Sequence, residues 1–338
     1  MTKKVCIIAE AGVNHNGDLE LARKLIKVAS EAGADYVKFQ SFKADSLVCK
    51  NAKKAQYQIR NTGIDDNQFK MIKALELSRG SHYELQKVCN NEGINFLSTP
   101  FDLDSLDLIL ELNLDFIKIP SGEVTHWPFL KAVGQSCKPV ILSTGMSSMK
   151  EVCQATEVLY TAGLSSDDLT ILHCNTEYPT PIEDVNLRAM NAIADKLGVK
   201  VGYSDHTLGI EVALAAVARG ACVIEKHFTL DRSLPGPDHR ASLEPNELKN
   251  MISGIRLIEK ALGKEQKLAS ASEIKNIEIA RRSIVAKIPI YKGQIFTKDN
   301  IICKRPAGGM SPMHWPNLIG SIADRDYDID DQIKLIKN

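Results

Sequence analysis

The stretch Cys222-Val223-Ile224-Glu225-Lys226-His227-Phe228-Thr229 predicts a strand that begins in an apolar core and ends at polar residues. Its β-branched start suits a parallel strand that is buried on both faces. Side chains alternate along a strand, so Glu225 and His227 share one face while Lys226 takes the other. A carboxylate and an imidazole that face inward indicate a metal or acid–base site. A surface ion pair at the strand end is the simpler alternative.

Other apolar runs resemble this one, and amphipathic helical patterns separate them. We predict strands at 5–9, 35–40, 95–99, 116–119, 139–143, 169–174, 200–204 and 222–227. Helical patterns include 19–31, 102–112, 149–162, 210–219 and 245–262. This alternation predicts an α/β fold, a (β/α)8 TIM barrel over residues 1–262. A doubly wound open sheet is the alternative, but no G-x-G-x-x-G motif follows the first strand.

The sequence changes character after the barrel. Residues 263–280 are polar and predict a linker. Residues 281–338 contain short strand-like pieces such as 283–286, broken by Gly293 and Pro306, which predicts a small second domain with little helix. Within the barrel, residues 49–67 form a long, charged and amide-rich connection. Such loops at the C-terminal face of a barrel commonly shape substrate pockets.

Composition and charge limit the classes of partner. Lys+Arg and Asp+Glu both number 42, so a net charge of zero gives no general electrostatic case for nucleic acid or an acidic membrane. No apolar run approaches the length of a membrane span, and the first residues lack a signal-peptide core, which predicts a cytoplasmic protein. Eight cysteines include no C-x-x-C pair. Cys6, Cys174 and Cys222 lie in apolar strand runs, so we predict reduced, buried thiols.

Polar residues at the strand ends form a constellation. In a barrel, one parity of each strand faces the interior, and active sites lie at the C-terminal rim. Taken singly, a lysine there can reach water and a histidine can be satisfied in the core. Convergence of all the strand ends on polar groups instead favours a site. The inward residues predicted by parity are Glu10, Lys38 with Gln40, Thr99, Lys118, Ser143, His173 with Asn175, Ser204 with His206, and Glu225 with His227.

The residue types indicate the chemistry. Two lysines and several hydroxyls suit an anionic substrate that carries phosphate and carboxylate. His206 and His227 lie on adjacent strands and can share one divalent cation, while Glu10 and Glu225 are positioned to supply oxygen ligands or a base. The residues of the predicted anion pocket are Lys38, Thr99, Lys118, Ser121, Ser143 and Ser204.

Three loop motifs each allow two interpretations. Asp238, after a Pro-Gly-Pro turn, faces the pocket or caps a solvated turn. The segment Asn14-His15-Asn16-Gly17 is a turn before a helix that Asp18 can cap, so its polar side chains are functional or purely structural. Tyr178 hydrogen-bonds a polyol or packs on the neighbouring prolines.

Several motifs together are specific for one family. They are IAEAGVNHNG at 8–17, VKFQ at 37–40, STPF at 98–101, KIPSGE at 118–123, STGM at 143–146, HCNTEYPTP at 173–181, SDHT at 204–207, EKHFT at 225–229 and GPD at 236–238. In these motifs the chain resembles the bacterial sialic acid synthases, which are nonulosonate synthases. The end of the chain from Ser283, including Lys304-Arg305-Pro306, resembles that family's small antifreeze-like (SAF) domain.

The resemblance implies an N-acetylneuraminate synthase, which condenses phosphoenolpyruvate with N-acetylmannosamine and releases phosphate. It implies phosphoenolpyruvate on the predicted anion pocket, and Mn²⁺ or another divalent cation such as Mg²⁺ or Co²⁺ on His206 and His227. Glu10 is the first candidate to position or deprotonate the attacking water, and Glu123 is the second. The implied catalytic residues are Glu10, Lys38, Lys118, Glu123, His206 and His227. The implied sugar-binding residues are Glu10, Tyr178, Asp238 and Arg305.

The family also implies a domain-swapped homodimer, in which Arg305 reaches the sugar's N-acetyl group in the partner's barrel. One departure affects the choice of sugar: Arg281-Arg282 stand where some sialic acid synthases have aromatic residues. A 2,4-diacetamido-2,4,6-trideoxyhexose, which gives legionaminic or pseudaminic acid, is therefore the alternative substrate. A catalytically inactive barrel that serves as a binding module is the alternative from a different class, and it requires replaceable rim residues.

Overall fold

Eight parallel strands form the sheet of the computed structural model, which describes residues 4–63 and 67–334. The hydrogen-bonded order is β3-β2-β1-β8-β7-β6-β5-β4, and the end strands β3 and β4 pack against each other, so the barrel is nearly closed. The predicted (β/α)8 barrel is confirmed. The strands are β1 Cys6–Gly12, β2 Tyr36–Ser41, β3 Asn95–Pro100, β4 Ile117–Ile119, β5 Val140–Ser143, β6 Leu169–Cys174, β7 Lys200–Asp205 and β8 Val223–His227.

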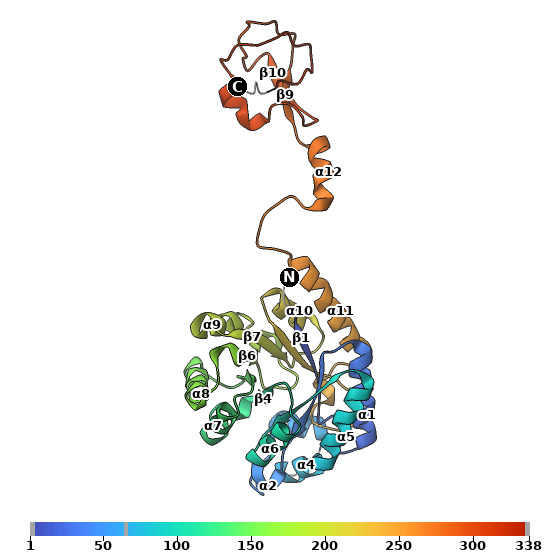
Figure 1. Ribbon diagram of the computed structural model, residues 1–338. Coiled ribbons are helices and arrows are strands. Elements are labelled where there is room, and N and C mark those ends of the chain that lie inside the picture. The colour runs from blue at the N-terminus through green and yellow to red at the C-terminus, as the bar shows by residue number, and fades with distance from the viewer. Residues whose placement is uncertain (1–3, 64–66, 335–338) are drawn as a thin grey trace. The chain divides into compact units, whose positions relative to one another are not determined.

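Helices surround this sheet, as Figure 1 shows. They are α1 Leu19–Ala32, α5 Arg79–Glu92, α6 Leu103–Glu111, α7 Trp127–Gln135, α8 Met149–Ala162, α9 Arg188–Leu197, α10 Glu211–Ala218 and α11 Pro245–Leu262. The first helix illustrates why they form: the side chain of Asp18 accepts a hydrogen bond from the Glu20 amide at its start, and Leu25 and Ile26 are buried against the sheet. The predicted helical patterns coincide with α1, α6, α8, α10 and α11 to within one residue.

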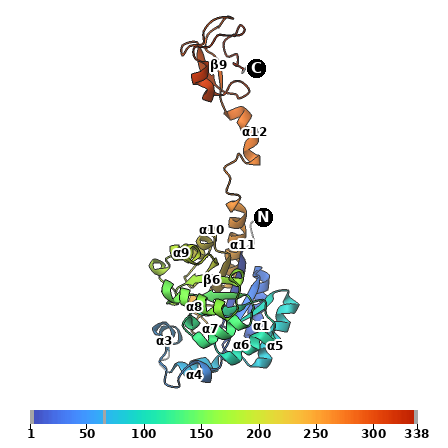
Figure 2. The ribbon, with the colours of Figure 1, turned by 60° about the vertical axis from the view of Figure 1, so that its left-hand side comes forward.

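The long connection after β2 contributes three short helices, α2 Ala44–Leu47, α3 Gln56–Thr62 and α4 Gln68–Ala74. Figure 2 shows α3 and α4 at the same end of the barrel. Residues 64–66, which belong to the predicted connection, lie outside the described residues. The end of α4 is held close to the turn after β1, since Gly17 has φ 78° and a Cβ there would lie 2.7 Å from the Ala74 carbonyl oxygen. Only glycine fits this turn without a shift of α4.

The chain divides into two compact units, Met1–Gly263 and Lys264–Asn338. The second unit has its own small core around Ile284, Phe296 and Tyr327. Its predicted strand at 283–286 is present and pairs antiparallel with a second strand. The elements are α12 Ala271–Ala280, β9 Ser283–Ala286, β10 Ile301–Lys304 and α13 Trp315–Leu318. The 3-10 turns of the two units are η1 Ser121–Glu123, η2 Ser166–Asp168, η3 Ile182–Asp184, η4 His239–Ala241 and η5 Pro312–His314.

Two findings differ from what the composition indicated. Helix α12 lies within the polar stretch 263–280, where Ser270 and Glu273 form a capping box that starts it. Cys174 is buried as predicted, but Cys6 and Cys222 are only half-buried. Their prediction was wrong because Cys6 is the first residue of β1 and Cys222 directly precedes β8, where the strands leave the core. Over residues 4–63 and 67–334, no helix combines the length and apolar content needed to cross a membrane.

Candidate active site

A cavity of about 490 Å³ opens where the strands of the barrel end. It brings together most of the residues that strand parity and the family motifs selected. Those that line it are Glu10, Lys38, Thr99, Lys118, Ser121, Ser143, Tyr178, Ser204, His206 and His227. A larger cavity of about 630 Å³ lies between α7 and α8 and includes none of these residues.

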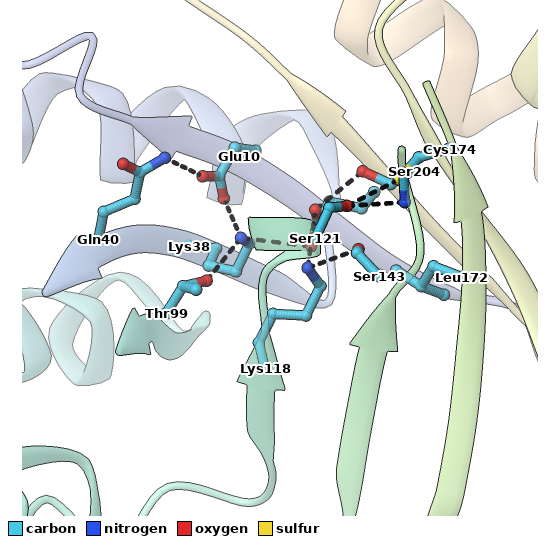
Figure 3. Close-up of polar contacts among 12 residues, drawn as sticks. Glu10, Lys38, Gln40, Thr99, Lys118, Ser121, Ser143, Leu172, Cys174 and Ser204 are labelled. Carbon is cyan, nitrogen blue, oxygen red and sulfur yellow. Dashed lines mark hydrogen bonds and ion pairs between the residues drawn. The ribbon is translucent and has the colours of Figure 1, made fainter. Parts of the chain in front are cut away.

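Lys38 is buried at the floor of this cavity, beside Glu10 (Figure 3). Its Nζ lies 2.9 Å from Glu10 Oε2 and donates a hydrogen bond of 2.7 Å to Thr99 Oγ1. Gln40 Nε2 donates to the other oxygen of Glu10 at 3.2 Å. Burial raises the pKa of Glu10, and Lys38 only partly opposes this. Burial would lower the pKa of Lys38, but the carboxylates of Glu10 and Glu225 raise it overall, so the ammonium stays charged.

Lys118 is the second buried cation, and Glu225 lies between it and Lys38. Glu225 Oε1 is 3.4 Å from Lys118 Nζ, and Glu225 Oε2 is 3.4 Å from Lys38 Nζ. Lys118 also donates to Ser143 Oγ at 2.8 Å, and Ser204 Oγ donates to Glu225 at 2.9 Å. Burial alone would raise the pKa of Glu225, but the two lysines lower it overall. Glu225, which we had considered as a metal ligand or base, is therefore held as the shared counter-ion of the lysines.

The sixth strand presents the opposite parity from the one we predicted. Cys174 lines the cavity, with its Sγ 3.2 Å from Ser121 Oγ (Figure 3), while His173 Nε2 donates to the Val185 carbonyl oxygen at 2.9 Å. His173 and Asn175 are thus wrong as inward side chains. The reason is that residues 169–174 are largely apolar at both parities, so alternation carried no signal.

His206 and His227 form an aromatic cluster with Tyr178. The two imidazole centroids are 5.5 Å apart, and the Tyr178 ring stacks on His206 at 4.1 Å. His206 Nδ1 donates to the Asn175 carbonyl oxygen, which leaves the lone pair of the ring on Nε2. Burial lowers the pKa of His206 to about 4 and that of His227 well below its usual range, so both rings are neutral.

These two rings fit a divalent cation. A neutral histidine whose second nitrogen donates to a backbone carbonyl is the usual form of a metal ligand. His227 Nδ1 is buried and has no hydrogen-bond partner in the described part of the chain. Gly12, at φ 52°, keeps this space open, since a Cβ there would lie 3.2 Å from both Glu10 Oε1 and His227 Cε1. Residues 4–63 and 67–334 contain no cluster of three or more His, Cys, Asp or Glu residues suited to a metal. The ligands that the described chain can supply here are therefore the two imidazoles.

Asp238 and Glu123 line an adjoining cavity of about 320 Å³, which also borders Tyr178 and His227. Asp238 is buried there rather than in a solvated turn, and burial raises its pKa to about 7. Glu123 Oε2 instead accepts a hydrogen bond from His126 Nδ1, which occupies one of its oxygens.

Sequence reasoning missed Tyr57, which lies on α3 in the long connection. Its ring centroid is 5.0 Å from that of Tyr178, so Tyr178 packs between Tyr57 and His206. The signal that could have found Tyr57 was an aromatic residue in an amide-rich loop.

Arg305 is exposed on the second unit, directly after β10, and that unit is described by itself.

The turn at 14–17 ties two loops of the barrel together. Asn14 Nδ2 donates to the Phe228 carbonyl oxygen at 2.8 Å and to Ser242 Oγ at 2.9 Å. His15 Nδ1 accepts from the Gly17 amide at 3.0 Å. These contacts support the structural interpretation of this motif, because they join the loop after β1 to the loops after β8.

An ion pair on the outer face of the barrel supports the strands that carry the site. Lys226 Nζ lies 2.7 Å from Asp205 Oδ2, and neither side chain is exposed. Lys226 also donates to the Thr207 carbonyl oxygen at 2.8 Å, and Asp205 Oδ1 accepts from the Thr207 amide at 2.9 Å. The pair therefore fixes the backbone on both sides of His206.

The fold and the cavity define a (β/α)8 protein with a cationic, hydroxyl-rich site at the C-terminal ends of its strands. Residues 25–267 match the NeuB family, and residues 281–334 match the SAF domain. The chain belongs to the NeuB family, and its barrel is that of a phosphoenolpyruvate-dependent nonulosonate synthase. Synthases of this family generally depend on a metal ion.

Named relatives cover nearly the whole chain. N,N'-diacetyllegionaminic acid synthase of Campylobacter jejuni is 54% identical over 335 residues, which is 98% of this chain and 99% of the relative. The synthase of the same name from Legionella pneumophila is 49% identical over 93% of this chain and 89% of the relative. The crystal structure of an N-acetylneuraminic acid synthetase from Leptospira borgpetersenii with citrate has a TM-score of 0.72 and 34% identity, covering 82% of this chain and 91% of that one.

Proposed function

We propose that this chain is an N,N'-diacetyllegionaminic acid synthase, which condenses phosphoenolpyruvate with 2,4-diacetamido-2,4,6-trideoxymannose and releases phosphate. The identity of 54% and 49% to two synthases of that name, over nearly the full chain, is the observation that carries this choice of sugar. N-acetylmannosamine, which the sequence analysis put first, is less well supported. The relatives named for sialic acid are more distant, at 34% for the Leptospira structure and 35% for the human N-acetylneuraminate-9-phosphate synthase.

Lys38 and Lys118 are proposed to bind the phosphate and carboxylate of phosphoenolpyruvate. Each ammonium is buried and already hydrogen-bonded to a hydroxyl, which favours tight contacts to anionic oxygens. Glu225, 3.4 Å from each ammonium, offsets their mutual repulsion and holds both in place before the substrate arrives. The hydroxyls proposed to complete this anion pocket are those of Thr99, Ser121, Ser143 and Ser204.

The bond-forming step joins C3 of phosphoenolpyruvate to the aldehyde carbon of the open-chain sugar, whose oxygen takes up a proton. Water then adds at C2, and phosphate leaves by cleavage of its C–O bond. Glu10 is proposed to position or deprotonate that water, because burial raises its pKa towards neutrality, where a carboxyl group can both take and give a proton. Tyr178 and Asp238 are proposed to bind the sugar. Glu123 is the weaker candidate for the base, since His126 holds its carboxylate.

His206 and His227 are proposed to hold the divalent cation, with Mn²⁺ as the first candidate and Mg²⁺ or Co²⁺ as alternatives. When bound, such a cation supplies Lewis-acid polarisation of a carbonyl oxygen. The neutral state of both rings and the hydrogen bond from His206 to the Asn175 carbonyl support this assignment.

We also propose a cytoplasmic, domain-swapped homodimer in which Arg305 binds the sugar in the partner's barrel. Exposed apolar side chains on the second unit support a role in association. They include Ile288, Tyr291, Ile295 and Ile322, at 49%, 62%, 54% and 65% exposed. Light scattering of the intact chain tests the dimer, and a monomeric mass at assay concentration would contradict it.

Phosphate release from phosphoenolpyruvate with Mn²⁺ tests the proposed function. We expect a kcat/KM at least tenfold higher for 2,4-diacetamido-2,4,6-trideoxymannose than for N-acetylmannosamine. Lys118→Met, which removes a cation from the anion pocket, is the inactive control. Equal or lower kcat/KM for the diacetamido sugar would make the chain a sialic acid synthase. No release with any mannosamine derivative would overturn the proposal and favour a binding module.

A further inference from the structure

The active-site cavity continues into the adjoining cavity of about 320 Å³. Gln40, Tyr57, Tyr178 and His227 line both, so the two cavities meet at these side chains. A substrate held at His227 therefore has room to extend into the second cavity. The condensation proposed above takes place in the first.

Part of the wall of the second cavity is apolar, and we call this part the apolar annex. It is formed by Val13, Phe42, Leu47, Val48, Met71 and Ile72, which come from the loops after β1 and β2 and from α2 and α4. Most of them belong to a small apolar cluster that is separate from the barrel core. Leu47, Met71 and Ile72 are only half-buried, so they present apolar surface that a ligand can cover.

Polar groups line the same cavity. They are Asp238, Glu123, Gln58 on α3 and Gln68 at the start of α4. The cavity therefore combines polar side chains with the apolar annex. An occupant that matches both carries hydrogen-bonding groups as well as methyl groups.

The wall is held in place before any ligand binds. Gly17 allows the end of α4 to pack directly against the turn after β1. At the other end of the helix, Asn67 Nδ2 donates a hydrogen bond of 2.9 Å to the Lys50 carbonyl oxygen, which joins α4 to the loop after α2. A fixed apolar surface selects between ligands because it cannot turn a polar group towards an added hydroxyl.

We propose that the apolar annex receives the C6 methyl and the 4-acetamido methyl groups of the sugar, and thereby selects a 6-deoxy diacetamido sugar over N-acetylmannosamine. This inference rests on the proposed function. N-acetylmannosamine would place its C6 hydroxyl against the apolar side chains of the annex, and an apolar pocket discriminates against such a hydroxyl by about a hundredfold.

The test is the ratio of kcat/KM for 2,4-diacetamido-2,4,6-trideoxymannose to that for N-acetylmannosamine, measured first on the intact wild-type chain. Met71→Gln keeps the length of the side chain and adds a polar group to the annex. We expect it to lower the ratio about tenfold and to leave the KM for phosphoenolpyruvate unchanged. Met71→Leu, which stays apolar, and Lys70→Gln, at an exposed position of α4, are the controls and should keep the wild-type ratio.

The outcomes separate the two proposals. A wild-type ratio of one or less refutes the diacetamido substrate and the annex with it. A high wild-type ratio that Met71→Gln leaves unchanged overturns the annex alone. Equal loss for both sugars in Met71→Gln would also overturn it, because the annex would then be only structural. A second variant, Val48→Thr, adds a hydroxyl with little change in volume and should lower the ratio in the same direction.

Discussion

Replacing Lys226 with Met is expected to lower the free energy of unfolding of the barrel by about 3–5 kcal/mol, the usual effect of removing one partner from a buried ion pair. Both side chains of the pair have no exposed surface, and the Nζ to Oδ2 distance is 2.7 Å. The variant leaves the Asp205 carboxylate buried without its cation and removes the donor to the Thr207 carbonyl oxygen. Since a domain is stabilised by only about 5–15 kcal/mol, this is a large share.

Guanidinium chloride unfolding followed by tryptophan fluorescence measures this loss. Trp127 lies on α7 of the barrel and Trp315 on α13 of the second unit, and they are the two tryptophans of the chain. A Trp315→Phe background therefore reports on the barrel alone. With slopes of about 2–6 kcal/mol/M, the midpoint should fall by roughly 1 M.

Two further variants make the prediction refutable. Lys27 forms a solvent-exposed pair with Glu31 at 3.9 Å, with side chains 63% and 65% exposed, so Lys27→Met should leave the midpoint almost unchanged. Adding Asp205→Asn to Lys226→Met removes the uncompensated charge and should recover part of the loss. If Lys226→Met behaves like Lys27→Met, the pair does not stabilise the barrel and the argument from burial fails.

Three other predictions follow from the site and the second unit. Chelation with EDTA should abolish phosphate release and added Mn²⁺ should restore it, because two imidazoles hold a metal weakly; full activity in EDTA would refute the metal assignment. Arg305→Ala should raise the KM for the sugar and leave that for phosphoenolpyruvate nearly unchanged, whereas the reverse pattern would move Arg305 to the phosphate. Burial lowers the pKa of His15 to about 4, so on acidification the imidazole is protonated at a higher pH in the unfolded chain than in the folded one. The free energy of unfolding should therefore fall by up to about 3 kcal/mol as the pH drops from about 6.5 to 4. The difference in unfolding midpoint between the wild type and His15→Gln at pH 7, 5 and 4 measures this loss, because other buried histidines titrate in the same direction, and a difference that does not change with pH would contradict a buried neutral His15.

Alternation along the strands predicted much of the cavity from sequence alone, because a polar residue that interrupts an apolar run marks a strand end. Lys38 and Lys118 were found in this way, and both line the cavity. The same reasoning failed on β6, where Cys174 rather than His173 faces inward, because the polar residue at this strand end lies on the outer face and hydrogen-bonds the Val185 carbonyl oxygen.

The apolar annex could not be derived in the same way. Met71 and Ile72 lie on a short helix inside a long connection, and their position depends on how that connection folds back over the barrel. A helix of this length is not stable by itself, so local propensity does not determine its place. Tertiary contacts decide it, such as the approach of α4 to Gly17.

Asp205 and Lys226 represent an intermediate case, since the pair follows from sequence once the barrel topology is known. Strand parity assigns both residues to the outer face, and in the structure they are register partners on the adjacent strands β7 and β8. Alternate residues of these two strands thus have separate tasks. His206 and His227 face the cavity, and their carbonyl oxygens accept hydrogen bonds from the Thr180 and Leu243 amides, each at 2.9 Å. Asp205 and Lys226, beside them on the outer face, add a buried ion pair to these contacts, so a search of the outward neighbours of any predicted barrel site should find further supporting contacts.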